Sequence, residues 1–221
     1  MPSAKLNNLS VDVIDLNTGN IGSVLNMLSR IGYVPRVLRS GSELTGINPV
    51  LLPGVGHFSQ AAIALERAGF REPLNTLHHR NWPILGICLG AQLMAQGSEE
   101  GEGCGLGWIA THVLRFPPVG PLGTALRVPH MAWQAFSPPN GVLPFSVPAG
   151  RMYFAHSFYI DPLPSGSGSV CQSEFGGVRF SSVVRAGNAI GAQFHPEKSH
   201  RHGKAFLSGW FAWGKLLIES L

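Results

Sequence analysis

A cysteine between two glycines is the first feature of this sequence that could do chemistry. Cys88 lies in Gly86-Ile87-Cys88-Leu89-Gly90, after a short apolar run and before helix-forming residues. This order predicts a strand, a sharp turn and a helix, as in the nucleophile elbow of serine hydrolases. A thiol on such a turn faces the first N–H groups of the helix, whose partial positive charge favours the thiolate. Cys88 is therefore a candidate nucleophile, although single cysteines are more often inert core residues.

A histidine and a carboxylate far downstream complete a catalytic set. In Gln193-Phe194-His195-Pro196-Glu197, an extended chain places His195 and Glu197 on one face. A carboxylate beside an imidazole fixes its tautomer and stabilises the imidazolium that forms when it takes a proton from a thiol. The alternative is a metal site built from Cys88, His195 and Glu197, which the absence of paired ligand spacing such as C-x-x-C disfavours. These residues therefore predict a Cys-His-Glu triad without a metal.

The elements that must position this triad are expected to form a single domain. The chain has 221 residues, which suits one domain spanning 1–221 with a sizeable core. With 44% hydrophobic and 13% charged residues, the surface is drier than average, which hints at a protein partner. No apolar run reaches membrane-spanning length, residues 1–10 lack the apolar core of a secretion signal, and three irregularly spaced cysteines fit a reducing compartment. We therefore expect a cytoplasmic protein without membrane contact.

The net charge of +4 raises the question of nucleic-acid binding. The basic residues are scattered, and the sequence has no basic run or platform of interleaved aromatic residues, so we expect no nucleic-acid partner. Among the nine histidines, His200-x-His202 has the spacing of a metal pair. Because Lys198 and Arg201 lie beside it, this pair is better interpreted as the solvated start of a helix.

The first half of the chain alternates between predicted strands and helices. Apolar runs predict buried strands at 11–16, 36–39, 49–52 and in the run that ends at Cys88. Helical spacing predicts helices around 24–31 and 61–65, and Asn20 can cap the first of them. This alternation implies right-handed crossovers and a parallel sheet. The strand that ends at Cys88 then lies near the centre of the sheet, and its carboxyl end opens on the crevice where ligands bind.

The second half of the chain contains more strands and turns. We predict strands at 106–116, 152–160 and 189–194, a hairpin of 170–175 against 178–184, and a flexible loop at 162–169. The strand at 189–194 returns the chain to the thiol. A final helix from about Ser199 is expected to bury one apolar stripe, formed by Phe206, Leu207, Trp210 and Phe211.

The cysteine elbow and the His-Pro-Glu motif together resemble those of the class I, triad-type glutamine amidotransferases. Further stretches are similar to the glutaminase subunits of imidazole glycerol phosphate synthases, and the matches run from Asp15 to about Ser199. The resemblance implies an α/β fold with a three-layer, open, mostly parallel, flavodoxin-like sheet and a smaller antiparallel addition. The matching stretches are Gly19-Asn20-Ile21-Gly22-Ser23-Val24, Leu51-Leu52-Pro53-Gly54-Val55-Gly56, Val128-Pro129-His130-Met131-Ala132-Trp133, Phe154-Ala155-His156-Ser157-Phe158 and His195-Pro196-Glu197-Lys198-Ser199.

The resemblance implies hydrolysis of glutamine to glutamate and ammonia through a glutamyl thioester on Cys88, without a cofactor. It also implies an oxyanion hole formed by the N–H of Leu89 and by a second donor, the N–H of Val55. The second donor lies in a loop whose glycines, Gly54 and Gly56, allow the peptide to turn. A loop that aims this donor only when a partner binds would keep the enzyme idle until then. The alternative is that residues 53–56 are only a strand-to-helix turn.

For glutamine itself, the resemblance implies three contacts. They are Gln92 one turn beyond the elbow, Glu99 as the counter-charge of the α-amino group, and Ser157 beside the α-carboxylate. Glu99 also belongs to Ser98-Glu99-Glu100-Gly101-Glu102, which is typical of an acidic surface turn. We prefer the binding role, because another carboxylate for the ammonium group is hard to find nearby.

Ammonia released into water would be protonated and lost, so we expect it to pass directly to an acceptor site on another protein. The resemblance implies a heterodimer with a (β/α)8-barrel cyclase, which makes imidazole glycerol phosphate and AICAR in histidine biosynthesis. The docking surface of the family maps to Asn20, Met131 and Trp133. An exposed methionine and tryptophan would anchor an interface, although buried core residues would look the same in the sequence.

Three residues depart from the pattern of the family. Ala132 replaces a glycine, Gln134 replaces an asparagine, and His57 follows the loop at 53–56 where a small residue is commoner. These positions lie near the residues expected to bind the partner and to control the oxyanion loop, so they bear on the choice of partner and on regulation and not on the triad. Three alternatives remain open: a paralogous amidotransferase that supplies ammonia for amidine formation on a surface-polysaccharide sugar, a class I amidotransferase for another synthase, and a non-catalytic binding subunit.

Overall fold

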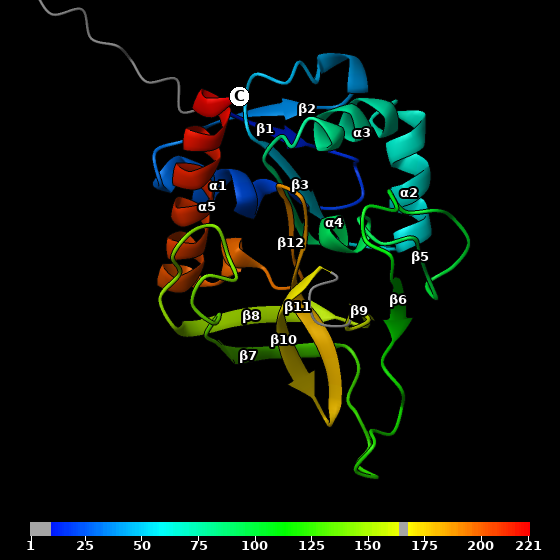
Figure 1. Ribbon diagram of the computed structural model, residues 1–221. Helices are drawn as coiled ribbons and strands as arrows, with labels where there is room; N and C mark the ends of the chain where they lie inside the picture. The colour runs from blue at the N-terminus through cyan, green and yellow to red at the C-terminus, as the bar shows by residue number, and fades with distance from the viewer. Residues whose placement is uncertain (1–9, 164–167) are drawn as a thin grey trace, which may run out of the picture.

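The computed structural model describes residues 10–163 and 168–221, and Figure 1 shows their arrangement. The loop predicted at 162–169 therefore lies partly outside the described residues, and the expectation about residues 1–10 lies almost wholly outside them. Among the described residues, no helix is long and apolar enough to cross a membrane.

A seven-stranded sheet forms the centre of the fold, and strand β4, which carries the cysteine, is the middle strand. The five strands from β12 to β2 run parallel, and the hairpin of β10 and β11 continues the sheet in antiparallel fashion. This arrangement confirms the predicted mostly parallel sheet. The order across the sheet is β10 (Ser169–Phe175), β11 (Val178–Ala186), β12 (Ala189–Ala192), β4 (Ile84–Cys88), β3 (Val50–Gly54), β1 (Ser10–Ile14) and β2 (Val34–Leu38).

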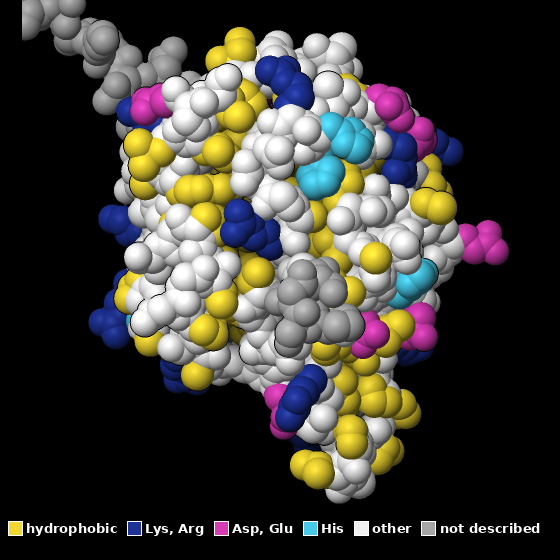
Figure 2. Space-filling model, in the orientation of Figure 1, with side chains coloured by type: hydrophobic (Ala, Val, Ile, Leu, Met, Phe, Trp, Pro, Cys, Tyr) yellow, Lys and Arg dark blue, Asp and Glu magenta, His cyan; other side chains and the backbone are white. Residues whose placement is uncertain are grey.

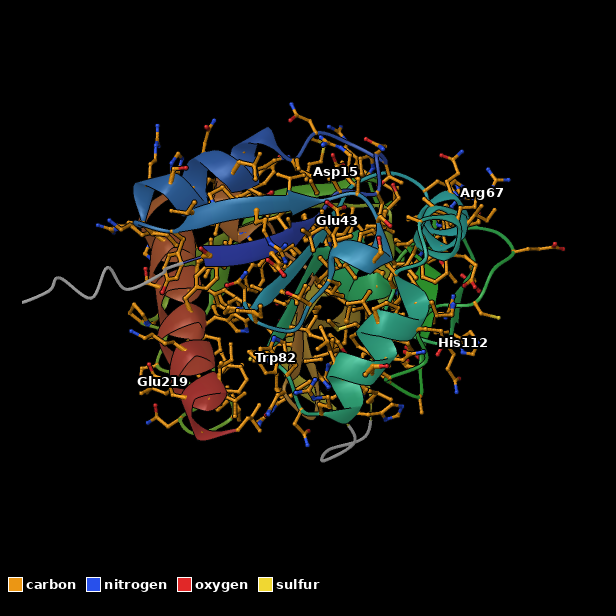
Figure 3. All side chains as sticks on the ribbon, turned by 90° about the horizontal axis from the view of Figure 1, so that it is seen from above. Asp15, Glu43, Arg67, Trp82, His112 and Glu219 are labelled. Carbon is orange, nitrogen blue, oxygen red and sulfur yellow. The ribbon has the colours of Figure 1, made fainter. Side chains whose placement is uncertain are left out.

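Helices cover both faces of the sheet and create two apolar cores. One core lies against α1 (Gly22–Arg30) and α5 (His200–Ser220), and it contains the predicted stripe from Phe206 to Phe211. The other lies against α2 (Phe58–Arg67), α3 (Arg71–His79) and α4 (Leu89–Gln92). Seen from above, the strands lie between α1 and α3, which gives the expected three layers (Figure 3).

Two smaller sheets lie beside the carboxyl end of the central sheet (Figure 1). One contains β5 (Gly97–Ser98), β6 (His112–Arg115) and β9 (Phe158–Ile160), and the other pairs β7 (His130–Phe136) with β8 (Gly150–His156). The strand predicted at 152–160 is therefore wrong as a single element. The chain breaks at Ser157, because β8 pairs with β7 whereas β9 pairs with β6.

The strand predicted at 106–116 is also wrong over most of its length. Only His112–Arg115 forms a strand. Before it, the backbone N–H groups of Leu106, Gly107 and Ile109 donate to carbonyl groups in the turns that follow α4, at 2.6, 3.1 and 3.0 Å. Residues 106–109 make these tertiary hydrogen bonds in place of the strand-to-strand hydrogen bonds that the apolar pattern predicted.

A protrusion at the lower end of the molecule carries exposed apolar side chains, among them Val119 and Leu122. Figure 2 shows hydrophobic side chains gathered there, over the loop that follows β6 and the tip of the β10–β11 hairpin. Leu122 in this loop packs near Gly177 at the hairpin tip, and Leu126 lies close to Gly176. The two segments therefore support each other through apolar contacts rather than through a shared strand ladder.

Candidate active site

Strand β4 ends at Cys88 in a turn of the kind that the sequence predicts. Cys88 has φ of 52° and ψ of −105°, a conformation that L residues rarely adopt. Such strain at a nucleophile persists only when the surrounding structure enforces it. The side chain is buried where β4 meets the first turn of α4.

Two glycines allow the chain to make this turn. A Cβ atom on Gly90 would lie 1.7 Å from the carbonyl oxygen of Leu52, and one on Gly86 would lie 2.6 Å from the carbonyl of Gly90. Both contacts are with backbone atoms, which cannot rotate away. The turn at Cys88 therefore requires glycine at both positions.

The helix after the cysteine is shorter than expected. Helix α4 spans only Leu89–Gln92, one turn, so few peptide dipoles are aligned behind the sulfur. The sequence-based argument that a helix N-terminus favours the thiolate is therefore weaker than it looked. A stronger positive charge comes from His195.

Strand β12 brings His195 to the same edge of the sheet as Cys88. It runs parallel to β4, with Ala192 opposite Ile87, and the chain continues past both strands in the same direction. His195 Nδ1 lies 2.8 Å from Glu197 Oε1, and the two side chains are only 2% and 5% exposed. Because a carboxylate can only accept, Nδ1 carries the proton and Nε2 is left for the sulfur.

Opposing effects set the pKa of His195. Burial lowers this pKa. The interactions with Cys88 and with the carboxylate of Glu197 raise it by more, so that the pKa of His195 lies at about 10. These interactions favour the protonated form of the imidazole of His195. The structure therefore brings together the three residues predicted to form the triad.

A cavity opens beside the sulfur and contains most of the residues predicted for oxyanion and glutamine binding. Its lining includes Cys88, Leu89, Val55, Gln92 and Ser157. Gly54 is placed differently: it lies opposite Cys88 at the end of β3 and lines a small separate cavity against His195 and Glu197.

The structure contradicts the placement of Glu99. Its side chain is exposed, and Oε2 accepts a hydrogen bond of 2.7 Å from the backbone N–H of Arg115, outside the cavity. The next residue, Glu100, lines the cavity instead, and its Oε2 accepts from the N–H of Phe58 at the start of α2. The turn at 98–101 directs these adjacent carboxylates in different directions.

The sequence profile described as glutamine amidotransferase class-I matches residues 12–213, nearly the whole chain. The chain belongs to the class I glutamine amidotransferases. This amidotransferase is 37% identical over 210 residues to the imidazole glycerol phosphate synthase subunit HisH of Desulfitobacterium hafniense (strain Y51), covering 92% of this chain and 94% of that protein. It is 35% identical over 203 residues to the HisH subunit of Bdellovibrio bacteriovorus, covering 90% and 98%.

Solved structures support the fold of this amidotransferase. A crystal structure described as a glutamine amidotransferase superposes with a TM-score of 0.69 at 18% identity, covering 93% of this chain and 98% of the other. The PurLQS structure from Thermotoga maritima superposes with a TM-score of 0.63 at 16% identity, covering 96% and 99%. At such identities the likeness concerns architecture alone.

The residues predicted for the partner surface of the amidotransferase differ in exposure. Met131 is 63% exposed on β7, and Asn20 is exposed before α1, where its side chain accepts a hydrogen bond from the N–H of Gly22 at 2.7 Å. Trp133 is half-buried and stacks on His200, with ring centroids 5.3 Å apart. Met131 is therefore a surface residue, and the core alternative is wrong for it.

Sequence analysis missed a set of buried polar residues in this amidotransferase. Gln193, His130 and His156 are all buried and hydrogen-bonded close to the elbow. The spacing of Gln193 and His195, two residues apart in a segment that the sequence predicts as extended, could have indicated that Gln193 lies on the same face as His195. Among the described residues, no group of three or more His, Cys, Asp or Glu side chains has the arrangement of a metal site.

Proposed function

We propose that this chain is the glutaminase subunit of an imidazole glycerol phosphate synthase, which hydrolyses glutamine and passes ammonia to a cyclase. The observation that carries the proposal is the buried cluster of Cys88, His195 and Glu197 at the edge of the sheet. Relatives named as that subunit, at 35% and 37% identity over at least 90% of the chain, support the choice of synthase.

The triad acts in two stages. The sulfur of Cys88 attacks the side-chain amide carbon of glutamine, and the imidazolium of His195 gives its proton to the departing ammonia as the C–N bond breaks. A glutamyl thioester remains. His195, now neutral, takes a proton from water, the hydroxide attacks the thioester, and glutamate leaves as the thiolate is restored. Glu197 holds the ring of His195 in place and stabilises its charged form.

The tetrahedral intermediate needs donors for its oxyanion. The N–H of Leu89 at the start of α4 is one, and the N–H of Val55 is the second when its peptide turns inward. The side chain of Val55 packs against Gly19, where an added Cβ would lie 2.0 Å from it. Asn20, the residue after Gly19, belongs to the proposed partner surface. A bound cyclase can therefore influence the loop that contains Val55. One missing donor raises the barrier by about 3 to 4 kcal/mol.

Glutamine is held by its α-groups at the far end of the cavity. Ser157 lies beside the α-carboxylate, and Glu100 takes the role first given to Glu99 as counter-charge of the α-ammonium group. Gln92 donates to the carbonyl of Phe158 at 2.9 Å and shapes the wall. Glu100→Gln should raise KM for glutamine at least about tenfold, because a charged hydrogen bond is lost. The matched variant Glu99→Gln should leave KM unchanged, and the reverse result would refute the assignment.

The cyclase partner, a (β/α)8 barrel, binds the face that carries Asn20, Met131 and Trp133. Trp133→Ala should weaken the complex by about 2 kcal/mol if the indole is an anchor. Titration calorimetry with the purified cyclase measures this loss, and an unchanged dissociation constant would remove Trp133 from the interface. If the chain instead serves a sugar-modifying enzyme, it will form no complex with the cyclase.

The central test is the glutaminase reaction of the complex. Cys88→Ala and Cys88→Ser should abolish glutamate release, and a glutamine analogue with a diazoketone group should label Cys88 in the native protein. Ammonia-dependent cyclase turnover should persist with the Cys88→Ala subunit when ammonium salt is supplied. Full glutamine turnover by either variant would refute the proposed function.

A further inference from the structure

A continuous set of buried hydrogen bonds leads from the catalytic sulfur to strand β7. Gln193 Nε2 donates to Cys88 Sγ at 3.7 Å, and Gln193 is fully buried. Gln92 Nε2 donates to Gln193 Oε1 at 3.2 Å and to the carbonyl oxygen of Phe158 at 2.9 Å. The orientations of the side-chain amides of Gln92 and Gln193 are therefore set by their hydrogen-bond partners.

The partners of Gln92 fix which way Gln193 points. The carbonyl of Phe158 can only accept, so the NH2 group of Gln92 must face it and also faces Gln193. Gln193 must then present its oxygen to Gln92, which leaves its own NH2 group for the sulfur of Cys88. The opposite orientation would place an oxygen lone pair against a thiolate and two NH2 groups against each other.

A pair of neutral histidines secures the other end of this set. His156 Nδ1 lies 2.8 Å from the same carbonyl of Phe158, so Nδ1 carries the proton and Nε2 accepts. His130 Nδ1 lies 3.2 Å from His156 Nε2 and is therefore the donor. The two residues are direct cross-strand partners of β7 and β8. The position of the Phe158 carbonyl is thus fixed by two independent donors, His156 and Gln92.

We propose that Gln193 is a further residue of the glutaminase reaction, which stabilises and aims the thiolate of Cys88 by donating a hydrogen bond to its sulfur. The inference rests on the proposed function, because it requires Cys88 to be the nucleophile. Gln193 donates when the sulfur is charged, both before attack and when the thiolate leaves the thioester. Gln92 and the Phe158 carbonyl are positioning groups that keep the Gln193 amide in this orientation.

A role limited to packing would not need this polarity. A buried amide could satisfy itself entirely on backbone groups, and a side chain of the same length without polar atoms would fill the same space. Here the amide nitrogen instead faces the sulfur of Cys88, whose charge changes during the proposed reaction. With one turn of helix behind the sulfur, its stabilisation depends on His195 and Gln193.

The test compares two variants of nearly equal volume in the full-length chain. Gln193→Met removes the donor and keeps the length of the side chain, and Gln193→Glu keeps the shape but replaces the donor with a charged acceptor. Iodoacetamide alkylation at pH 7 is followed by mass spectrometry of the Cys88 peptide, while the exposed Cys104 in the same molecule serves as an internal standard. Ser182→Ala, a buried change next to the Gln193 backbone, is the matched control.

Alkylation of Cys88 at pH 7 should fall about tenfold in Gln193→Met and further in Gln193→Glu, because a hydrogen bond to a charged group is lost. The profile of alkylation against pH should move to higher pH in both variants. In the cyclase complex, kcat for glutamine should fall about tenfold while KM stays within about twofold. Cys104 alkylation should remain constant, and Ser182→Ala should behave like the native chain.

Native alkylation and turnover in a folded Gln193→Met would overturn the role of Gln193 and leave Cys88 as the nucleophile. If Gln193→Met does not fold, native alkylation in Gln193→Glu overturns the role equally. Failure of the proposed function looks different: Cys88 in the native chain would react no faster than Cys104, and Cys88→Ala would retain glutaminase activity.

Discussion

The buried pair of His130 and His156 should make the protein sensitive to acid. Burial lowers the pKa of His130 from 6.5 to about 4, and burial together with the nearby charges of His130 and His195 lowers that of His156 to about 3. Below pH 6.5 the unfolded chain therefore binds more protons than the folded one. Stability that is fully present above pH 6.5 is lost as the pH falls towards 4.

The size of the effect follows from these pKa values. For each histidine, acidification from pH 7 to pH 5 lowers the free energy of unfolding by about 2 kcal/mol, or roughly 4 kcal/mol for the pair. That is a large share of the 5 to 15 kcal/mol that roughly brackets the stability of natural domains. His195 has a raised pKa and acts in the opposite sense. Its contribution to the free energy of unfolding rises by about 1 kcal/mol as the pH falls from 7 to 5.

The double variant His130→Phe/His156→Phe isolates the contribution of the pair. Both rings lie among Phe116, Phe154 and Phe180, so two phenyl rings suit the site. Urea unfolding at pH 7, 6 and 5, followed by tryptophan fluorescence, should show a loss on acidification that is roughly 4 kcal/mol smaller than in the native chain.

The exposed His112 on β6 offers a control for this experiment. His112→Phe should show the same loss of stability on acidification as the native chain. Equal pH dependence in the native chain and the double variant would refute the reasoning. It would mean that the imidazoles are protonated inside the fold, or that the pair is already buried in the unfolded state.

Two further predictions concern the triad and the elbow. Glu197→Gln removes a charge that helps to raise the pKa of His195, so kcat for glutamine should fall on the order of a hundredfold, measured by glutamate release. A fall of less than threefold would contradict the orienting role. Gly90→Ala should lower stability by about 3 kcal/mol or more, because its Cβ would lie 1.7 Å from the Leu52 oxygen. In Gly97→Ala the nearest neighbour of the new methyl group would be 3.5 Å away, so equal thermal unfolding of the two variants would disprove the steric argument.

Strong local patterns made the central sheet and the clustering of Cys88, His195 and Glu197 predictable. The apolar run before Cys88 and the two glycines around it indicate a strand and a sharp turn. The common face of His195 and Glu197 was predicted from an extended chain, but Glu197 lies in a 3-10 helix at Pro196–Lys198, and it is this turn that brings its carboxylate to His195. Helix α3 was missed because its nine residues include only two buried apolar side chains, Leu74 and Leu77, which gives little periodicity.

Other features depend on contacts that no local pattern records. Glu99 and Glu100 are chemically identical neighbours in a turn, and only the contacts with Arg115 and Phe58 separate them. The set of hydrogen bonds that runs from His130 to Gln193 joins β7, β8 and the segment after β12, which are distant in sequence. Tertiary pairing, rather than composition, decides such networks.

The order β12, β4, β3 has a consequence for how this protein tolerates change. Those three neighbouring strands deliver the proposed base, the proposed nucleophile and the proposed second oxyanion donor to one rim, so the site depends on strand register more than on loop length. Deleting a single residue within β12 would turn Gln193 and His195 towards the opposite face of the sheet. Lengthening or shortening the protrusion after β6 would leave those three strand ends where they are.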